Sequence, residues 1–195
     1  MTSHPPLVVV LAGPNGAGKS TTAPYLLKDA LAVEEFVNAD TIAQGLSAYR
    51  PETTAVAAGR VMLERLHVLA RARRDFAFET TLAGRSHERW LRALRATGYR
   101  VHLVFLSLPS ADLAVARVAD RVRRGGHHVP DDVVRRRFLA GAKNLFSVYM
   151  DAVDAWTIYD NADVMSPRLV ASRAVGGSTA IADAAAWKAL QELQS

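Results

Sequence analysis

The sequence contains no cysteine and no apolar run of 18 residues. Without cysteine there are no disulfides and no thiolate metal sites, which is compatible with a reducing cytoplasm. Without a long apolar run there is no helix that could span a membrane. Residues 2–6 lack the charged and apolar regions of a secretory signal. We therefore expect a cytoplasmic protein without membrane contact.

The composition indicates a globular chain with a core of its own. Half of the 195 residues are hydrophobic, which separates the chain from disordered sequences. A chain of this length forms one domain in most cases, so we expect a single domain over residues 1–195. The net charge of +5 is concentrated, because residues 117–137 hold seven arginines against three aspartates.

Residues 13–21 form the most informative motif of the sequence. Their pattern is G-x-x-x-x-G-K-[ST], the phosphate-binding loop. The apolar run 7–12 precedes the motif as a strand and a helical segment follows it, which is the context that aims backbone N–H groups at a polyphosphate. We expect Lys19 to reach the β- and γ-phosphates of ATP and Ser20 to bind Mg²⁺. The predicted nucleotide contacts in this loop are Pro14, Asn15, Gly16, Ala17, Gly18, Lys19, Ser20 and Thr21.

Apolar strands and helical patterns alternate along the rest of the chain. This alternation predicts an α/β protein with three layers, in which helices cover both faces of a mainly parallel sheet. We expect strands at 7–12, 35–38, 75–78, 101–106, 156–159 and 169–171. We expect helices at 19–31, 51–73, 86–96, 110–124, from 131 onwards, and at 178–194.

Missing motifs narrow the class of phosphate-loop protein. The sequence has no Asn-Lys-x-Asp motif of a GTPase and no Leu-Ser-Gly-Gly-Gln signature of a transporter ATPase. A small-molecule kinase remains, with an acid after the second strand and an arginine lid late in the chain. Asp40 ends the second strand, where it could accept a hydroxyl proton or hold the metal shell. The alternative is that Asp40 caps the helix that starts at Thr41.

Glu79 and the residues after it are candidates for contact with a substrate. Glu79 ends the third predicted strand at the same sheet edge as the phosphate loop, where ligands of open α/β sheets bind. Its alternative role is a structural ion pair. Thr80, Thr81 and Arg85 follow in a loop and could hydrogen-bond a substrate, although Arg85 could equally be a solvated residue before the next helix.

A series of motifs resembles the zeta-toxin-like kinases, in particular short members labelled as predicted ABC-type ATPases. Besides the phosphate loop, the series comprises Asn38-Ala39-Asp40, Phe78-Glu79-Thr80-Thr81-Leu82, Arg121-Val122 with Gly125-Gly126-His127 and Val129-Pro130, Arg136-Arg137-Phe138, and Tyr159-Asp160-Asn161.

The resemblance implies an ATP- and Mg²⁺-dependent kinase that phosphorylates a hydroxyl of a nucleotide sugar such as UDP-N-acetylglucosamine, or of a related metabolite. It implies that Lys19 is the phosphate lysine, that Ser20 is the metal ligand and that Asp40 is the catalytic base. Glu79 and the loop from Thr80 to Arg85 would face the sugar nucleotide. It also makes an antitoxin protein a candidate partner.

The arginine-rich segment corresponds by the same resemblance to a lid over ATP, at about residues 112–137. Arg121, or else Arg117, matches the first lid arginine of these kinases, and His127 stands where the second is expected. The alternative is an RNA or DNA end kinase that uses these arginines on a phosphate backbone. No aromatic residues interleave with them, which disfavours nucleic acid as a partner. A nucleotide-binding module without enzymatic activity is the third hypothesis.

Overall fold

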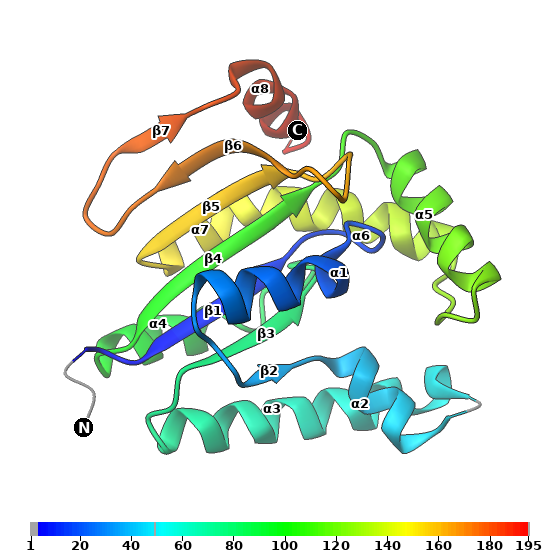
Figure 1. Cartoon of the computed structure of the whole chain (residues 1–195), viewed down its shortest axis with the longest axis horizontal. Helices are drawn as coiled ribbons and strands as arrows, with labels where there is room; N and C mark the ends of the chain where they lie inside the picture. The colour runs from blue at the N-terminus through cyan, green and yellow to red at the C-terminus, as the bar shows by residue number, and fades with distance from the viewer. Residues whose placement is uncertain (1–3, 49, 195) are drawn as a thin grey trace.

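The computed structural model describes residues 4–48 and 50–194. Within these residues seven strands form one sheet in the order β2-β3-β1-β4-β5-β6-β7. The first five are parallel, and β6 and β7 extend the sheet as antiparallel strands (Figure 1). The predicted α/β class with a mainly parallel sheet is therefore confirmed. The strands are β1 (Leu7–Ala12), β2 (Phe36–Val37), β3 (Phe76–Thr80), β4 (Arg100–Ser107), β5 (Ala155–Asp160), β6 (Arg168–Arg173) and β7 (Thr179–Ile181).

Helices connect the parallel strands, and two of them continue as π-helical segments. The first π-helical segment begins at Pro24, which has no N–H to donate to the α-helical ladder. The helices are α1 (Lys19–Ala23, continued by the π-helix Pro24–Ala30), α2 (Ala39–Leu46), α3 (Ala55–Arg71, preceded by the 3₁₀ turn Pro51–Thr54), α4 (Glu88–Ala96), α5 (Ala111–Arg123), α6 (Asp131–Asn144, continued by the π-helix Leu145–Tyr149), α7 (Met150–Ala152) and α8 (Ala184–Glu192).

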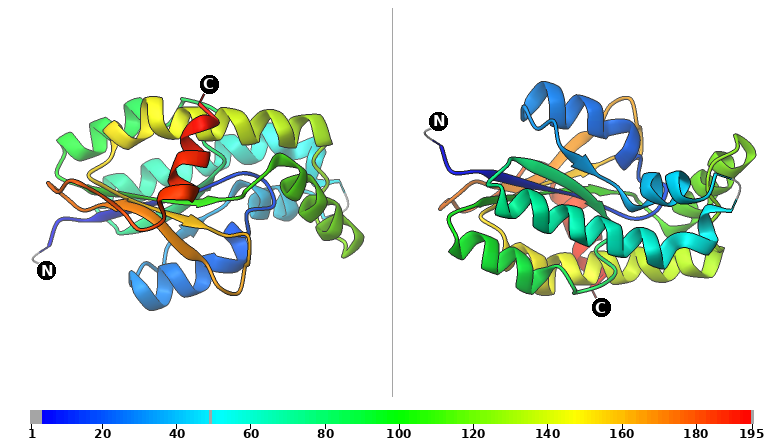
Figure 2. Two further views of the ribbon diagram at one scale, coloured as in Figure 1. Left: turned by 90° about the horizontal axis from the view of Figure 1, so that it is seen from above. Right: turned by 90° about the horizontal axis from the view of Figure 1, so that it is seen from below.

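The alternation of side chains along β1 divides the core into two layers. Val8 and Val10 face a cluster that contains residues of α3, α4 and α8. Val9 and Leu11 face the opposite cluster, which contains residues of α1 and α5. All four side chains are fully buried. Helices therefore cover both faces of the sheet, as the views from above and from below show (Figure 2).

Two predicted boundaries are wrong. The second strand ends at Val37, so Asp40 lies in the first turn of α2 and not at the end of a strand. The predicted helix 178–194 is shorter, because residues 179–181 pair with β6 as the edge strand β7. The helix begins only after Asp183, whose side chain accepts the Ala186 N–H at 3.0 Å.

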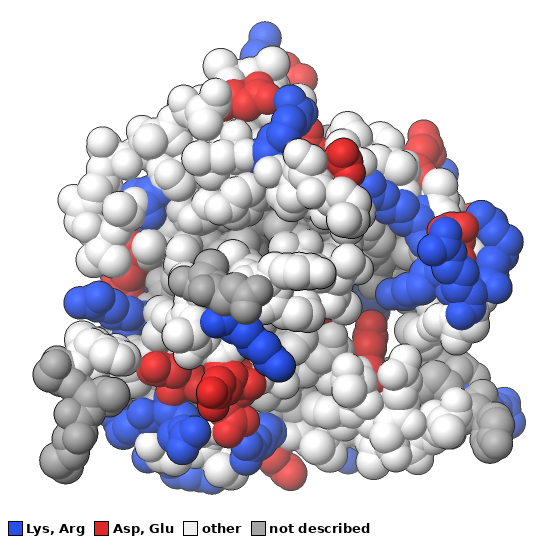
Figure 3. All heavy atoms as spheres, viewed as in Figure 1, with Lys and Arg blue, Asp and Glu red and all other residues white. Residues whose placement is uncertain are grey.

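The carboxyl ends of the parallel strands meet at one edge of the sheet. Helices α1, α2 and α5 begin near this edge, where β1, β2 and β4 end (Figure 1). Lysine and arginine side chains gather over α5 on the face shown in Figure 3. None of the helices in the described ranges is both long and apolar enough to cross a membrane.

Candidate active site

A residue that follows the last parallel strand, β5, holds the phosphate loop in place. Gly18 has a φ of +80°, and a Cβ on it would lie 2.8 Å from Nδ2 of Asn161. Asn161 follows β5 and is fully buried, and its Nδ2 donates to the Ala17 carbonyl at 2.6 Å. Only glycine fits both the conformation and the space at position 18. The loop is therefore preorganised, with its amides at the start of α1.

Lys19 is buried beneath this loop. Its Nζ donates to the carbonyls of Gly13 and Pro14 at 2.8 and 2.9 Å, and it lies 3.5 Å from Oε1 of Glu79. Burial lowers the pKa of Lys19, while the nearby carboxylates of Glu79 and Asp40 act in the opposite direction. The lysine therefore stands inside the loop, where its charge is screened little by water.

Glu79 joins three polar groups, two from the start of α1 and one from the residue that caps α2. Its Oε2 accepts from the Ser20 hydroxyl at 3.0 Å and from Asn38 Nδ2 at 2.7 Å, and its other oxygen faces Lys19. The ion pair that was the alternative role of Glu79 is therefore present, and it lies within the candidate site. A hydroxyl and a carboxylate 3.0 Å apart are hard oxygen donors of the kind that Mg²⁺ prefers. The described residues contain no cluster of three or more acidic, histidine or cysteine ligands.

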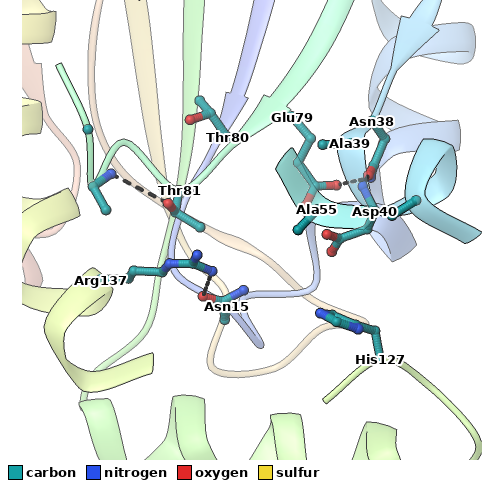
Figure 4. Close-up of a pocket in the computed structure, with 13 residues that line it drawn as sticks. Asn15, Asn38, Ala39, Asp40, Ala55, Glu79, Thr80, Thr81, His127 and Arg137 are labelled. Atoms are coloured by element: carbon teal, nitrogen blue, oxygen red, sulfur yellow. Dashed lines mark hydrogen bonds between the residues drawn. The ribbon is translucent and has the colours of Figure 1, made fainter. Parts of the chain in front are cut away.

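Asp40 is not the cap of α2. The Asn38 side chain caps this helix by accepting the backbone N–H groups of Asp40 and Thr41. The cap interpretation of Asp40 is therefore wrong, because Asn38 turns the chain into the helix two residues earlier. The Asp40 side chain is exposed and points into a cavity (Figure 4).

Two cavities adjoin at this edge of the sheet. The first, of about 370 Å³, lies over the end of β3 and the start of α2. The second, of about 480 Å³, lies over the phosphate loop and α5. Lys19 and Ser20 line only the second, whereas Thr80 and Thr81 line only the first. Asn15, Asp40 and Glu79 line both cavities and form their common wall.

The predicted threonines lie in the first cavity, but Arg85 does not line it. The hydroxyls of Thr80 and Thr81 accept the backbone N–H groups of Leu82 and Ala83, so each still has its O–H to donate. Arg85 instead donates through Nε to Asn144 Oδ1 at 3.0 Å.

The three predicted lid residues lie in different surroundings. Arg117 donates to the carbonyls of Gly16, Asn161 and Ala162, so it ties α5 to the phosphate loop. Arg121 lines the second cavity and donates to the His127 carbonyl at 2.7 Å. The His127 ring, expected beside ATP, lines the first cavity (Figure 4).

Three further polar residues belong to the site. Asn38 holds Glu79, Asn161 holds the phosphate loop, and Arg137 of α6 lines the first cavity. An Asn before a predicted helix is a capping signal that could have identified Asn38. Arg137 stands in a run of three arginines, and only the contacts of α6 reveal which of the three faces the site.

A family model described as an AAA domain (AAA_33) matches residues 8–145. The chain belongs to this family. An uncharacterized protein of Haemophilus influenzae is 28% identical over 130 residues, which is 67% of this chain and 91% of that protein.

Solved structures share the fold. The crystal structure of AvrRxo1-ORF1:-ORF2 with ATP superimposes with a TM-score of 0.73 at 19% identity, and the match covers 98% of this chain. This chain spans only 64% of that chain's length. The PezAT chromosomal toxin-antitoxin system of Streptococcus pneumoniae matches with a TM-score of 0.64 at 18% identity, over 98% of this chain and 79% of that chain. The chain therefore has the fold of P-loop kinases.

Proposed function

We propose that this protein is an ATP- and Mg²⁺-dependent phosphotransferase, similar to the zeta-toxin kinases. It would transfer the γ-phosphate of ATP to a hydroxyl of a nucleotide sugar such as UDP-N-acetylglucosamine, or of a related small metabolite. The observation that carries this proposal is the common wall of the two cavities, made of Asn15, Asp40 and Glu79. A kinase needs its donor and its acceptor to meet at one such place.

The second cavity is the proposed ATP site. The loop amides and Lys19 would hold the phosphates, as in other phosphate-loop proteins. Arg121 lines this cavity, and its Nε is buried without a partner among the described residues. A phosphate oxygen would satisfy that donor. Ser20, with Glu79 beside it, would hold Mg²⁺, which neutralises phosphate charge when bound.

The first cavity is the proposed acceptor site. Asp40 has an exposed carboxylate there, and no described residue donates a hydrogen bond to it. It would take the proton of the acceptor hydroxyl as the hydroxyl oxygen bonds to the γ-phosphorus. The bond between the γ-phosphorus and the bridging oxygen breaks, and ADP leaves with the bond's electron pair. Thr80 and Thr81 would orient the acceptor through their O–H groups.

We place a polynucleotide kinase second. Several exposed arginines that would contact a nucleic acid already have partners. Arg123 and Arg124 pair with Asp120, and Arg135 pairs with Asp112. Pairing with carboxylates reduces the net positive field that a phosphate backbone would meet. A non-enzymatic nucleotide-binding module comes third, because it leaves the acceptor-side carboxylate of Asp40 without a role.

Transfer from γ-³²P-labelled ATP tests the proposal. We expect wild-type protein with Mg²⁺ to label an acceptor among nucleotide sugars, dinucleotides and oligonucleotides. Lys19→Ala should lower the rate at least ~100-fold, since it removes the charge at the transferred phosphate. Lys28→Ala, at an exposed lysine of the following π-helix, is the control. Undiminished transfer by a folded Lys19→Ala variant would contradict the kinase assignment.

An antitoxin partner is proposed on the likeness to PezAT alone. If this protein is a toxin like those of toxin-antitoxin systems, its expression in a bacterium should slow growth, and expression of the Lys19→Ala variant should not. Unchanged growth across several hosts would favour a housekeeping kinase and remove the reason to expect an antitoxin.

A further inference from the structure

Arg137 is a cation at the first cavity, and no acidic side chain in the described part of the chain pairs with it. It lines the first cavity, and its Nη1 donates to Asn15 Oδ1 at 3.5 Å. Within residues 4–48 and 50–194, no carboxylate lies within ion-pair distance of it. Arg135, two residues earlier on α6, has Asp112 at 2.6 Å. A half-buried guanidinium held only by an amide oxygen retains donors for a ligand.

The packing of α6 fixes where Arg137 points. Gly141 lies one turn further along the helix, and a Cβ there would be 2.5 Å from the Thr81 carbonyl oxygen. Asn144 follows on the same face and donates to the carbonyls of Leu82 and Ala83. This face of α6 therefore lies directly on residues 81–83, which follow β3, and the missing side chain at Gly141 permits the approach. Arg137 projects from the same face towards Asn15 (Figure 4).

The charges of the first cavity are separated. Asp40 and Glu79 lie on the side of α2 and β3, and Arg137 projects from α6 on the opposite side (Figure 4). Glu79 is already paired with Lys19, whereas neither Asp40 nor Arg137 has an ion pair within 4.0 Å among residues 4–48 and 50–194. A ligand that fits this pattern presents a hydroxyl to Asp40 and a negative group to Arg137.

We propose that Arg137 determines acceptor specificity by binding an anionic group, a phosphate or a carboxylate, of the molecule whose hydroxyl is phosphorylated. This inference rests on the proposed function and deepens it: it names the residue that recognises the negative charge of the acceptor, and it excludes uncharged sugars and alcohols from the related metabolites. A guanidinium binds both kinds of group through two parallel N–H bonds.

The alternative ligand for Arg137 is the γ-phosphate itself. The cavities favour the acceptor, because Arg137 lines the one that contains Thr80 and Thr81 and is absent from the one that contains Lys19 and Arg121. The two ligands predict different kinetics. If Arg137 contacts the γ-phosphate, its loss should also lower the rate of ATP hydrolysis in the absence of an acceptor. If Arg137 contacts only the acceptor, that rate should not change.

The experiment separates a small-molecule cell extract by anion exchange into a neutral and an anionic pool. Each pool serves as acceptor for γ-³²P-labelled ATP with wild-type protein and with Arg137→Gln, Arg137→Lys and Arg136→Gln. Arg136 is the exposed neighbour on α6 and carries the same charge, so it is the matched control. Phosphodiesterase and phosphatase treatment of the anionic pool distinguishes a phosphate acceptor from a carboxylate. Acceptor-free ATP hydrolysis is measured in parallel.

We expect wild-type protein to label only the anionic pool. Arg137→Gln should lower that labelling about 10- to 100-fold, the usual loss for a hydrogen-bonded charge. Arg137→Lys should recover part of it, and Arg136→Gln should stay within about twofold of wild type. Acceptor-free hydrolysis should be equal in all four proteins.

Three results would overturn the proposal: labelling of the neutral pool, no effect of Arg137→Gln, or an equal loss of acceptor-free hydrolysis in that variant. Labelling of neither pool by wild-type protein would contradict the proposed function itself.

Discussion

The amide oxygen of Asn38 accepts the backbone N–H of Asp40 at 2.7 Å, while the amide nitrogen of the same side chain donates to Glu79 at 2.7 Å. Asn38 thus does the structural work at the start of α2, and the Asp40 carboxylate is not needed for it. The residue that caps the helix and the proposed catalytic base are therefore different residues, two positions apart. Substitutions at Asp40 can therefore test catalysis without disturbing the helix.

Asp40→Asn should lower phosphoryl transfer ~100-fold or more, because an amide cannot accept the hydroxyl proton. The melting temperature and the dissociation constant for ATP should stay close to wild type, since Lys19 and the loop amides are unchanged. Asn38→Ala is the complementary variant, and it should lower stability by about 1 kcal/mol through loss of the cap. Transfer at the wild-type rate in Asp40→Asn would remove Asp40 from the mechanism.

Glu79→Gln should raise the Mg²⁺ concentration that gives half-maximal activity and lower kcat at least ~10-fold. The neutral amide is a poorer ligand for a hard cation. It also leaves the buried Lys19 cation without its ionic partner, which should lower stability by about 1–3 kcal/mol. Activity is titrated with Mg²⁺, and stability is measured by urea denaturation. An unchanged Mg²⁺ dependence would place Glu79 outside the metal shell.

The fold could be predicted from sequence because its signals are local. The apolar run of β1 and the glycine pattern of the loop each identify one element, and alternation of strands and helices gives the parallel sheet. The ends of some helices and strands could not be predicted, because a capping side chain or a pairing strand decides them. The Asn38 cap moves the start of α2, and pairing with β6 turns residues 179–181 into a strand.

The site could be predicted only in part, because its remaining contacts are distant in sequence. Arg117 reaches Asn161, which is 44 residues away, and Asn144 reaches Leu82 across 62 residues. No spacing rule relates such pairs. Likewise the run Arg135-Arg136-Arg137 contains three identical side chains, and the sequence does not say which of them meets the cavity.

Arg121 and Arg117 should differ in kinetics although they lie one helical turn apart on α5. Arg121→Ala should lower kcat about 100-fold with little change in the KM for ATP, since a lid arginine acts on charge that develops in the transition state. Arg117→Ala should instead lower stability by about 1–2 kcal/mol and raise the KM for ATP, because its bonds to three backbone carbonyls hold the loop. Steady-state kinetics and thermal melting separate the two. If both variants keep the wild-type kcat, neither arginine is the lid residue.

Ionisation of the buried Tyr149 hydroxyl should make the protein less stable at high pH. Its hydroxyl donates to the Gly84 carbonyl at 2.6 Å, and burial raises the pKa of Tyr149 to about 12. Because the folded-state pKa lies above the unfolded value of about 10, the stabilisation is complete below pH 10 and is lost as the pH rises towards 12. The loss amounts to at most about 3 kcal/mol.

Urea denaturation at pH 8, 10 and 11.5 measures this effect. Tyr149→Phe should be less stable than wild type at pH 8, and the difference should shrink as the pH rises. Tyr25→Phe, at a side chain that is 71% exposed, should follow the wild-type curve. A constant difference between Tyr149→Phe and wild type would show that the phenol does not titrate in this range.

Glu79 lies in the wall between the two cavities and also holds Lys19 and Ser20 of the phosphate loop. A nucleotide that draws Lys19 and Ser20 to its phosphates changes the charge balance around the carboxylate that the acceptor meets. Binding at one cavity must then alter affinity at the other, and thermodynamic linkage makes the two factors equal. If the cavities hold ATP and the acceptor as proposed, the two are expected to bind with heterotropic cooperativity in which Glu79, one of the three residues of the common wall, takes part.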